Sequence, residues 1–380
     1  MPKLETREYQ TRILSKTIST LESLNSENVK NRECLSVMIE SPTGSGKTIM
    51  GFQVLQEILN RSQSLLGKNA SEVKIGWCAM RRELLHQGRE ANETMMHVPN
   101  VQYVSIFDTN PPDMDVIVYD ECQHSVANSA VNIYNISRPK IVLGLSATPY
   151  RTDRVKLCFH RVIKDAGYRV LIAEGFLSQF KQYIIPDWNP ETVVNTYLQE
   201  PERWGKSIAF FRTVEDCVTA CNMVNEAGMR AAVVTGNSPR EELLETFDRG
   251  GIDIIFNVYV LSEGFDCPQL RTVFCRPSSK SPTIQMCGRA FRKAEGKEYC
   301  NLVQSKDTKF PFTRMATAEE QFVWDEQGWR SIGTNNTVNK TLEIMRMKVA
   351  QAPEVKMPKA VSNSQKKNRV IGSLRPEDFS

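Results

Sequence analysis

The chain has 380 residues, which is enough for two or three domains. Hydrophobic residues make up 41% and charged residues 24%, an ordinary globular composition that allows sizeable cores. No apolar run approaches the length of a membrane span, and residues 1–8 lack the apolar region of a signal peptide, so we expect a cytoplasmic protein with no membrane association. The net charge of +4 permits nucleic-acid binding without arguing for it, because a local basic groove matters more than the total.

The ten cysteines are scattered along the chain and include no C-x-x-C pair. A disulfide framework is not expected in a chain of this size and class. Cys217 and Cys221 are four residues apart within a predicted helix. They suit either a metal site or the buried interior, and we favour two buried thiols that pack as small hydrophobic groups.

The first predicted element is a helix over residues 3–24, with apolar residues on or near one face. It contains the segment Arg7-Glu-Tyr-Gln10. A glutamine amide both donates and accepts hydrogen bonds, so Gln10 is a candidate reader of an adenine edge. The alternative is a solvated helix face, and the spacing alone does not decide between the two.

A strand, a glycine turn and a helix follow. Residues 34–40 form an apolar run of strand length, residues 41–48 have the sequence Ser-Pro-Thr-Gly-Ser-Gly-Lys-Thr, and residues 49–59 have apolar side chains at helical spacing. The turn fits G-x-x-x-x-G-K-[ST] when Ser41 stands at the first glycine position. This context predicts a phosphate-binding loop in preference to an ordinary strand–turn–helix junction.

The loop residues suit a nucleotide. Glycines let backbone N–H groups converge on phosphate oxygens, and the start of the helix adds partial positive charge. Lys47 would reach the β- and γ-phosphates, and the Thr48 hydroxyl would bind Mg²⁺.

The next strand, residues 73–79, leads into a helix that begins with Arg81 and Arg82. Arginines at such a junction bind phosphates in some proteins, whereas in others they only start a surface helix. A short strand over residues 101–106 precedes a break at Pro111 and Pro112.

Two further buried strands end in polar residues. The strand that begins at Asp115 ends at Asp120 and Glu121, and the strand of residues 140–149 ends at Ser146 and Thr148. Ligands gather at the carboxyl ends of parallel strands, so the two acids should lie beside the phosphate loop. Asp120 suits a Mg²⁺ ligand, Glu121 suits a general base for an attacking water, and the hydroxyls can bridge the acids to a more distant group.

Strands alternating with helices over residues 1–150 predict a doubly wound α/β domain. Breaks within residues 151–205 mark a linker, and a second α/β series follows from residue 206 without a phosphate loop of its own.

Arg289 and Arg292 are three residues apart in the second series, so we expect them on one helix face. Two such arginines suit charge stabilisation of a phosphoryl-transfer transition state, and the alternative is a surface salt-bridge pair. Gly288 indicates a close backbone approach and favours the first interpretation.

As an ordered set these segments resemble the motifs of superfamily two helicases of the DEAD/DEAH-like type. The segments are REYQ, SPTGSGKT, RRELLHQ, DECQH, GLSATP, SIAFF, VLSEGFDCP and QMCGRAFR. The resemblance is nearest to the branch that includes XPB and the UvsW-type phage helicases, and it covers roughly residues 1–305. It implies two tandem RecA-like parallel-sheet domains with ATP in the cleft between them and a nucleic-acid strand across their tops.

The resemblance assigns a role to each matching residue. Phosphates and Mg²⁺ would be held by loop residues and Asp120, the adenine would face Arg7 and Gln10, and the nucleotide cleft would be completed by Gly264 and Asp266. The loop residues are Thr43, Gly44, Ser45, Gly46, Lys47 and Thr48. Glu121 would be the catalytic acid and Arg289 with Arg292 the arginine fingers. Gln123, Ser146, Thr148 and Gln285 would couple hydrolysis to movement, and Arg82 would contact the nucleic-acid strand.

The chain departs from the family pattern at two places. Gln123 stands where many relatives carry histidine, which affects coupling more than hydrolysis. No glycine-containing motif Ib is identifiable between Gln87 and Asp115, so the first domain should grip a strand less well.

The predicted domain boundaries are 1–155, 156–205 for the linker, 206–305, and 306–380 for a short C-terminal extension. In the extension, Trp324 and Trp329 lie in a predicted hairpin, where they either stack on bases or pack on a neighbouring domain. Residues 338–350 have helical spacing, and residues 353–380 form a predicted mobile basic tail.

We expect a monomeric ATP-dependent DNA helicase or translocase that acts on single-stranded, forked or branched DNA with ATP and Mg²⁺ as cofactors. Three alternatives stay open: a duplex-DNA translocase that does not separate strands, an RNA helicase, and a nucleic-acid-binding scaffold with an inactive ATPase.

Overall fold

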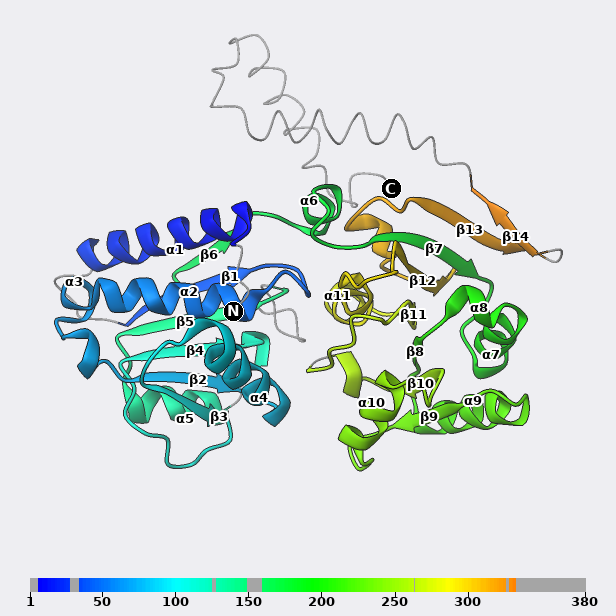
Figure 1. Ribbon diagram of the computed structural model, residues 1–380, viewed down its shortest axis with the longest axis horizontal. Coiled ribbons are helices and arrows are strands. Elements are labelled where there is room, and N and C mark those ends of the chain that lie inside the picture. The colour runs from blue at the N-terminus through cyan, green and yellow to red at the C-terminus, as the bar shows by residue number, and fades with distance from the viewer. Residues whose placement is uncertain are drawn as a thin grey trace, which may run out of the picture. The chain divides into compact units, whose positions relative to one another are not determined.

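The structure is a computed structural model of the chain (Figure 1). It describes residues 6–27, 34–124, 128–148, 159–262, 264–325 and 328–332. The predicted helix at 338–350 and the basic tail lie outside the described residues. No helix among the described ranges is long and apolar enough to cross a membrane.

The first sheet has six parallel strands in the order β3-β2-β4-β5-β1-β6. In chain order its strands are β1 Leu35–Glu40, β2 Ile75–Ala79, β3 Val101–Ser105, β4 Val116–Asp120, β5 Ile141–Ser146 and β6 Arg161–Lys164. The helices of this part are α1 Glu8–Glu27, α2 Lys47–Asn60, α3 Ser62–Leu66, α4 Arg82–Ala91 and α5 Asn128–Ser137. The central strands are apolar along their whole length because side chains on both faces of a parallel sheet are buried.

Side chains of the first sheet alternate between two hydrophobic clusters. Val37 and Ile39 of β1 pack with residues of α1 and α2, whereas Met38 packs with Ile133 of α5 on the opposite face. Helices therefore cover both faces of the sheet, and the predicted doubly wound domain is confirmed. The helix predicted over residues 3–24 corresponds to α1, which begins later, at Glu8, and ends at Glu27, with its buried side chains at helical spacing.

The second sheet has eight strands in the order β14-β13-β7-β12-β11-β8-β10-β9, and only β13 and β14 pair antiparallel. Its strands are β7 Gln179–Ile185, β8 Ser207–Phe210, β9 Ala231–Val234, β10 Ile254–Asn257, β11 Thr272–Phe274, β12 Tyr299–Ser305, β13 Glu320–Asp325 and β14 Gly328–Ser331. The accompanying helices are α6 Tyr168–Ala173, α7 Pro190–Gln199, α8 Pro201–Trp204, α9 Val214–Glu226, α10 Arg240–Asp248 and α11 Lys280–Gly288. The fold class predicted from the sequence, two tandem RecA-like parallel-sheet domains, is confirmed.

Single-turn helical segments join several of these elements. They are η1 Ala70–Glu72, the π-helical η2 Asn92–Met96, η3 Cys122–His124, η4 Val260–Ser262, η5 Arg289–Phe291 and η6 Phe312–Arg314. Three of them, η3, η4 and η5, lie within three residues of the ends of β4, β10 and α11, near candidate site residues predicted from the sequence.

Residues 156–205, which the sequence predicted to be a linker, contribute strands to both sheets in the structure. They contain β6, which pairs with β1 in the first sheet, and β7, which pairs with β12 in the second. β6 has the sequence Arg-Val-Ile-Lys and β7 has the sequence Gln-Phe-Lys-Gln-Tyr-Ile-Ile, so their longest apolar runs are only two and three residues long. The second sheet also extends into the predicted C-terminal extension through β13 and β14.

The β13–β14 hairpin carries the two tryptophans of that extension. The Trp329 ring centroid lies 5.0 Å from Tyr183 and 5.8 Å from Trp204, and the Trp324 ring packs edge-on against Trp329 at 5.1 Å. Aromatic rings at these separations stabilise each other beyond simple burial. The structure therefore supports the packing alternative for Trp329.

Cys217 and Cys221 lie in α9, as the sequence predicts, and both thiols are buried in the cluster between α7, α9 and the second sheet. Burial raises the pKa of the Cys217 thiol to about 12, so it stays neutral.

Candidate nucleotide-binding site

The predicted phosphate loop runs from the end of β1 to the start of α2. Gly44 and Gly46 have φ angles of 81° and 80°, in the left-handed region that favours glycine. Ser41, which replaces the first glycine of the pattern, is buried and donates a 2.8 Å hydrogen bond to the Ser45 hydroxyl. The serine therefore ties the two ends of the turn together.

Lys47 begins α2 and is only 8% exposed, and its Nζ lies 3.4 Å from the Pro42 carbonyl oxygen. The ammonium is thus held over the loop. Thr48 follows it on the first turn of the helix. A cation and a hydroxyl at a helix N-terminus, behind a turn rich in backbone donors, form a site suited to phosphate.

Two residues of α1 form hydrogen bonds with the backbone of the phosphate loop. The Tyr9 hydroxyl and the Gln10 amide both donate to the Ser45 carbonyl oxygen, at 2.5 and 3.2 Å. Gln10 Oε1 accepts from the Arg7 backbone at 3.0 Å, and the Arg7 guanidinium lies 5.1 Å over the Phe176 ring. Burial raises the pKa of Tyr9, so its hydroxyl stays protonated and can donate. Gln10 thus contacts the loop, which the sequence did not predict, and its role toward adenine stays a prediction.

The acidic pair stands at the carboxyl end of β4, beside the loop. Asp120 and Glu121 are each 8% exposed, and Asp120 Oδ1 accepts a 3.0 Å hydrogen bond from the Glu121 backbone. Glu121 has a φ of 50°, which is rare for a residue with a side chain. Such strain costs about 1–3 kcal/mol and concentrates at functional sites.

Hydrogen bonds lead from Glu121 away from the loop. Gln123 Nε2 donates to Glu121 Oε2 at 3.1 Å, and the Ser146 hydroxyl lies 2.6 Å from Gln123 Oε1. Ser146 Oγ also accepts from the Thr148 backbone at 3.0 Å. The Thr148 hydroxyl lies 3.2 Å from that of Ser281 in α11. The predicted coupling residues of the first domain therefore form one connected chain that reaches the second domain.

The second domain contributes two arginines. The Arg292 guanidinium forms an ion pair with Asp266, and a Cβ atom on Gly44 would lie 3.2 Å from Arg292 Cγ. Burial lowers the pKa of Arg292 to about 10, and the side chain still stays charged at neutral pH. Arg289 is 6% exposed and donates to the carbonyl oxygens of Ser262, at 2.8 Å, and Phe265, at 3.1 Å.

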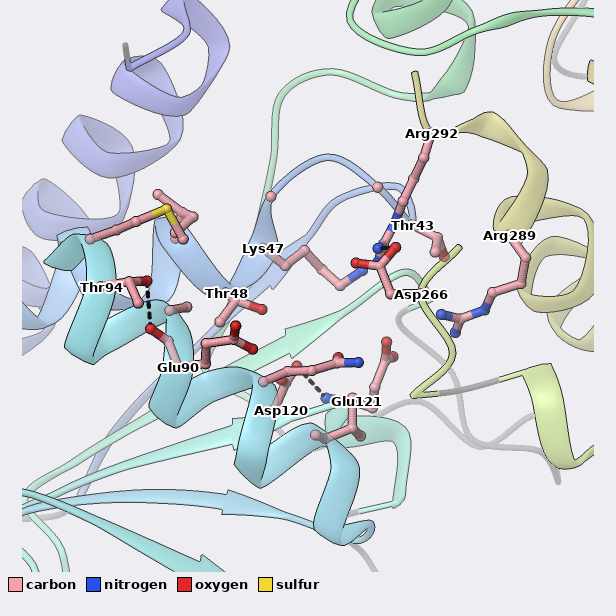
Figure 2. A pocket seen from close by; sticks show the side chains of 17 residues that line it. Thr43, Lys47, Thr48, Glu90, Thr94, Asp120, Glu121, Asp266, Arg289 and Arg292 are labelled. Carbon is pink, nitrogen blue, oxygen red and sulfur yellow. Dashed lines mark hydrogen bonds and ion pairs between the residues drawn. The ribbon is translucent and has the colours of Figure 1, made fainter. Parts of the chain in front are cut away.

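The prediction that Arg289 and Arg292 lie on one helix face is wrong, because both residues follow the end of the helix. Helix α11 ends at Gly288, Arg289 opens a single 3₁₀ turn, and Arg292 is extended, with a ψ of 138°. The chain leaves the helix before the second arginine, so i,i+3 spacing no longer places the two side chains in line. Both still reach the same cavity (Figure 2).

That cavity has a volume of about 370 Å³ and joins the two domains' candidate residues (Figure 2). The predicted residues that line it are Thr43, Gly44, Gly46, Lys47, Thr48, Asp120, Glu121, Asp266, Arg289 and Arg292. The other predicted residues are not part of its lining. Among them, Gly264 has a φ of 64° next to Asp266, and Gln285 is buried and accepts a hydrogen bond from the Tyr259 hydroxyl.

The sequence did not predict the wall that α4 and η2 contribute. Gln87, Glu90 and Thr94 line the cavity together with the exposed Met95. Glu90 and Thr94 are labelled in Figure 2. Gln87 also donates to the Gly264 carbonyl oxygen at 3.3 Å. A sequence pattern could have predicted this wall: Gln87, Glu90 and Thr94 are polar residues at positions i, i+3 and i+7, a spacing that places their side chains on one helix face.

Arg82, the predicted nucleic-acid contact, is exposed at the first position of α4. Its neighbour Arg81 instead donates to the Val260 carbonyl oxygen at 2.9 Å. Met80 and Phe107, at the carboxyl ends of the paired strands β2 and β3, are 39% and 56% exposed. The carboxyl edge of the first sheet therefore presents an arginine and two large apolar side chains to solvent.

The fold and these motifs define a class: proteins with two tandem RecA-like domains, the first of which carries a phosphate-loop sequence. Two family models match the chain. The "Type III restriction enzyme, res subunit" model matches residues 3–110 and 68–151, and the "Helicase conserved C-terminal domain" model matches residues 189–294. The chain belongs to superfamily two, the DEAD/DEAH-like helicases. The XPB/UvsW-type branch within it stays a prediction.

Individual relatives are distant. A 51.5 kDa protein of a Lactococcus phage is 26% identical over 278 residues, 63% of this chain and 59% of the relative. The candidate ATP-dependent helicase IRC3 of Saccharomyces cerevisiae is 27% identical over 239 residues, 52% of this chain and 34% of that protein. The chain thus spans between a third and three fifths of the lengths of these relatives.

Among solved structures, S. cerevisiae Dbp5 bound to RNA and ADP–BeF₃ is similar to this chain. Its TM-score is 0.52 at 15% sequence identity, and the match covers 80% of this chain and 88% of that one. This likeness supports the fold.

Proposed function

We propose that the chain is an ATP-dependent helicase or translocase that moves along or remodels DNA. The observation that carries the proposal is the cavity in which Lys47 and Glu121 of the first domain meet Arg292 of the second. A phosphate-binding cation, a carboxylate base and an arginine across one cavity are the parts that phosphoryl transfer to water needs.

Each side chain has a distinct part in the proposed reaction. Lys47 and the backbone donors of the loop bind and orient the phosphates. Glu121 accepts the proton of the attacking water, and Arg292 neutralises charge that develops on the transferred phosphoryl group. Asp266 holds the Arg292 guanidinium through its ion pair, so it orients the positive charge.

The donor set fits a magnesium ion held mainly by phosphates and water. Thr48 and Asp120 both line the cavity and offer oxygen ligands, and the described residues contain no cluster of three or more histidine, cysteine or acidic side chains suited to a metal. Mg²⁺ in nucleotide sites takes one or two protein oxygens together with phosphates and keeps several waters. When bound, the ion would neutralise phosphate charge.

A bound strand would follow the carboxyl edge of the first sheet. Arg82 is exposed there beside Met80 and Phe107, and a cation next to apolar surface suits a polyanion with flat bases. The Glu121–Gln123–Ser146–Thr148 hydrogen bonds give a route by which occupancy of the nucleotide cavity changes the contact with α11. The resemblance favours DNA, and the chain is expected to act as a monomer.

The test is steady-state ATP hydrolysis by the full chain with Mg²⁺, measured alone and with single-stranded DNA, forked DNA, four-way DNA, duplex DNA or RNA. Stimulation by single-stranded or branched DNA, together with strand displacement, supports the proposal. Stimulation by duplex DNA without displacement identifies a duplex translocase, and stimulation by RNA alone identifies an RNA helicase. Nucleic-acid binding without hydrolysis identifies a scaffold and overturns the enzyme assignment.

A further inference from the structure

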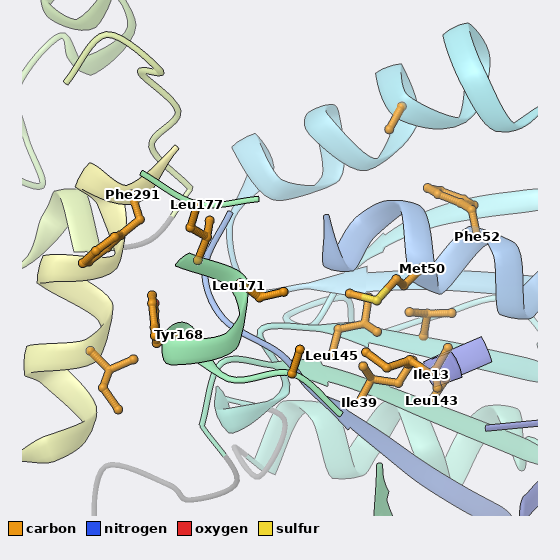
Figure 3. Packing of buried hydrophobic residues seen from close by; sticks show 14 of the residues in the cluster. Ile13, Ile39, Met50, Phe52, Leu143, Leu145, Tyr168, Leu171, Leu177 and Phe291 are labelled. Carbon is orange, nitrogen blue, oxygen red and sulfur yellow. The ribbon is translucent and has the colours of Figure 1, made fainter. Parts of the chain in front are cut away.

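Tyr168 lies where the phosphate loop, α6 and α11 meet. Tyr168 is 2% exposed, and Figure 3 shows it with Phe291 in the buried cluster. Its ring centroid lies 5.3 Å from that of Phe291 and 5.1 Å from that of Phe312. It is the first residue of α6, within the segment that links the two sheets. Neither the motif set nor the proposed reaction uses this side chain.

The hydroxyl of Tyr168 bonds to the phosphate loop. Its oxygen accepts a hydrogen bond from the Thr43 backbone at 3.2 Å. Thr43 itself lines the nucleotide cavity. Burial raises the pKa of Tyr168 to about 12, so the group is a neutral hydroxyl at every pH at which the protein would work. A buried backbone N–H needs such a partner, because leaving it unpaired costs about 1–3 kcal/mol.

The same hydroxyl abuts the end of α11. A Cβ atom placed on Gly288 would lie 2.6 Å from the Tyr168 oxygen and 3.0 Å from the Thr43 side chain. Real Cβ atoms essentially never come as close as 2.6 Å to another heavy atom, and Gly288 has an ordinary helical φ of −56°. Glycine is therefore needed here for space and not for its backbone conformation. Arg289 and Arg292 follow directly, so this contact sets how near they come to the loop.

We propose that Tyr168 is a positioning residue of the nucleotide site, which holds Thr43 of the phosphate loop against Gly288 so that the loop and the two arginines keep their spacing. The hydroxyl links the loop, and the ring packs on Phe291, between the two arginines. The inference rests on the proposed ATP hydrolysis. It adds a side chain outside every sequence motif to the residues on which turnover depends.

The first test is Tyr168→Phe, which removes only the hydroxyl and keeps the ring packing. We expect the KM for ATP to rise about two- to tenfold, as for the loss of one buried hydrogen bond, and kcat to fall as well. The Tyr197→Phe variant is the matched control, because Tyr197 is equally buried, in the α7 core of the second domain. Tyr197→Phe should leave both constants unchanged. Wild-type KM and kcat in Tyr168→Phe would overturn the inference.

The second test uses the close contact itself. Gly288→Ala should lower kcat at least about tenfold, because the new methyl group pushes the α11 end from the Tyr168 oxygen. In the double variant Gly288→Ala/Tyr168→Phe that oxygen is gone and only the 3.0 Å contact with the Thr43 side chain remains, so activity should recover part of the way toward the level of Tyr168→Phe alone. A double variant no better than Gly288→Ala would overturn the inference. If Gly288→Ala acted through a general structural defect, its effect on kcat and that of Tyr168→Phe would instead add in the double variant.

Affinity for a fluorescent ATP analogue, measured without turnover, separates this inference from the proposed function. If the wild type binds the analogue but does not hydrolyse ATP, the proposed function fails. The Tyr168 inference is then judged by whether Tyr168→Phe weakens analogue binding relative to Tyr197→Phe.

Discussion

The side chain of Arg292 lies directly over Gly44, where a Cβ atom on the glycine would be 3.2 Å from Arg292 Cγ. One residue belongs to the phosphate loop and the other to the segment after α11, so the approach exists only when the two sheets are placed together. The guanidinium is held there by Asp266. The arrangement makes the second domain part of the candidate nucleotide site.

Replacement of this arginine should therefore stop turnover without preventing nucleotide binding. We expect Arg292→Ala to lower kcat for ATP about 10³-fold or more, because arginines that stabilise phosphoryl transfer contribute effects of this size. Affinity for a fluorescent ATP analogue should stay within a few fold of wild type. Lys293→Ala is the control, because Lys293 is the adjacent exposed cation. Hydrolysis by Arg292→Ala at the wild-type rate would rule out the assigned role.

Glu121 should be required for hydrolysis in the same way. Glu121→Gln keeps the side-chain volume but removes the base, so kcat should fall at least about 100-fold while nucleotide binding persists. Steady-state hydrolysis and analogue binding measure the two effects separately. The exposed Glu241 of α10 supplies the matched control, and Glu241→Gln should behave as wild type. If Glu121→Gln turned over ATP normally, another group would have to be the base.

Two glycines with similar backbone angles should respond differently to alanine. Gly46 has a φ of 80° and its Cβ would lie 2.8 Å from Gln10 Nε2, whereas Gly67 has a φ of 68° with no atom within 4 Å. Both alanine substitutions should lower the free energy of unfolding by about 1–2 kcal/mol, because a residue with a Cβ atom is strained in the left-handed conformation. Only Gly46→Ala should also lose nucleotide affinity, which calorimetric or fluorescence titration measures. Equal affinities in the two variants would contradict this account of the loop.

Ser146→Ala should separate hydrolysis from movement. It removes the hydroxyl between Gln123 and Thr148, so the chain of hydrogen bonds from Glu121 to α11 is broken. We expect basal hydrolysis within a few fold of wild type, and at least a tenfold loss of nucleic-acid stimulation and strand displacement. Ser207→Ala, at a buried serine of β8 in the second sheet, is the comparison. Parallel losses of basal and stimulated hydrolysis would argue against a coupling role.

The hairpin tryptophans should matter for stability and not for nucleic-acid affinity. Trp329→Ala removes ring contacts with Tyr183 and Trp204 and should lower the free energy of unfolding by about 2 kcal/mol, less than for a fully buried aromatic. Trp329→Phe should recover part of this loss. Chemical denaturation gives the stability, and a titration with labelled single-stranded DNA gives the affinity. A large loss of affinity with unchanged stability would favour base stacking instead.

Several predictions from the sequence depended on local pattern and were confirmed. The buried strand before the loop, the helix that starts at Lys47 and the strand that ends at Asp120 follow from apolar runs and helical spacing. The pattern missed β6 and β7, because their apolar runs are only two or three residues long and do not stand out from a loop. It also misplaced Arg289 and Arg292 on one helix face, because Gly288 was interpreted as a point of close backbone approach and not as the end of α11, which glycine also indicates.

The sequence by itself determined the residue types at residues 41–48, at Asp120 and Glu121, and at the two arginines, and hence the chemistry that the chain can supply. Those features are local, since each depends on neighbours within a few positions. Only the tertiary structure decided that Arg292 lies over Gly44, that α4 forms a wall of the cavity, and that Tyr168 bonds to Thr43. Side chains far apart in sequence become neighbours through the crossovers of two sheets, and residue spacing carries no measure of that approach.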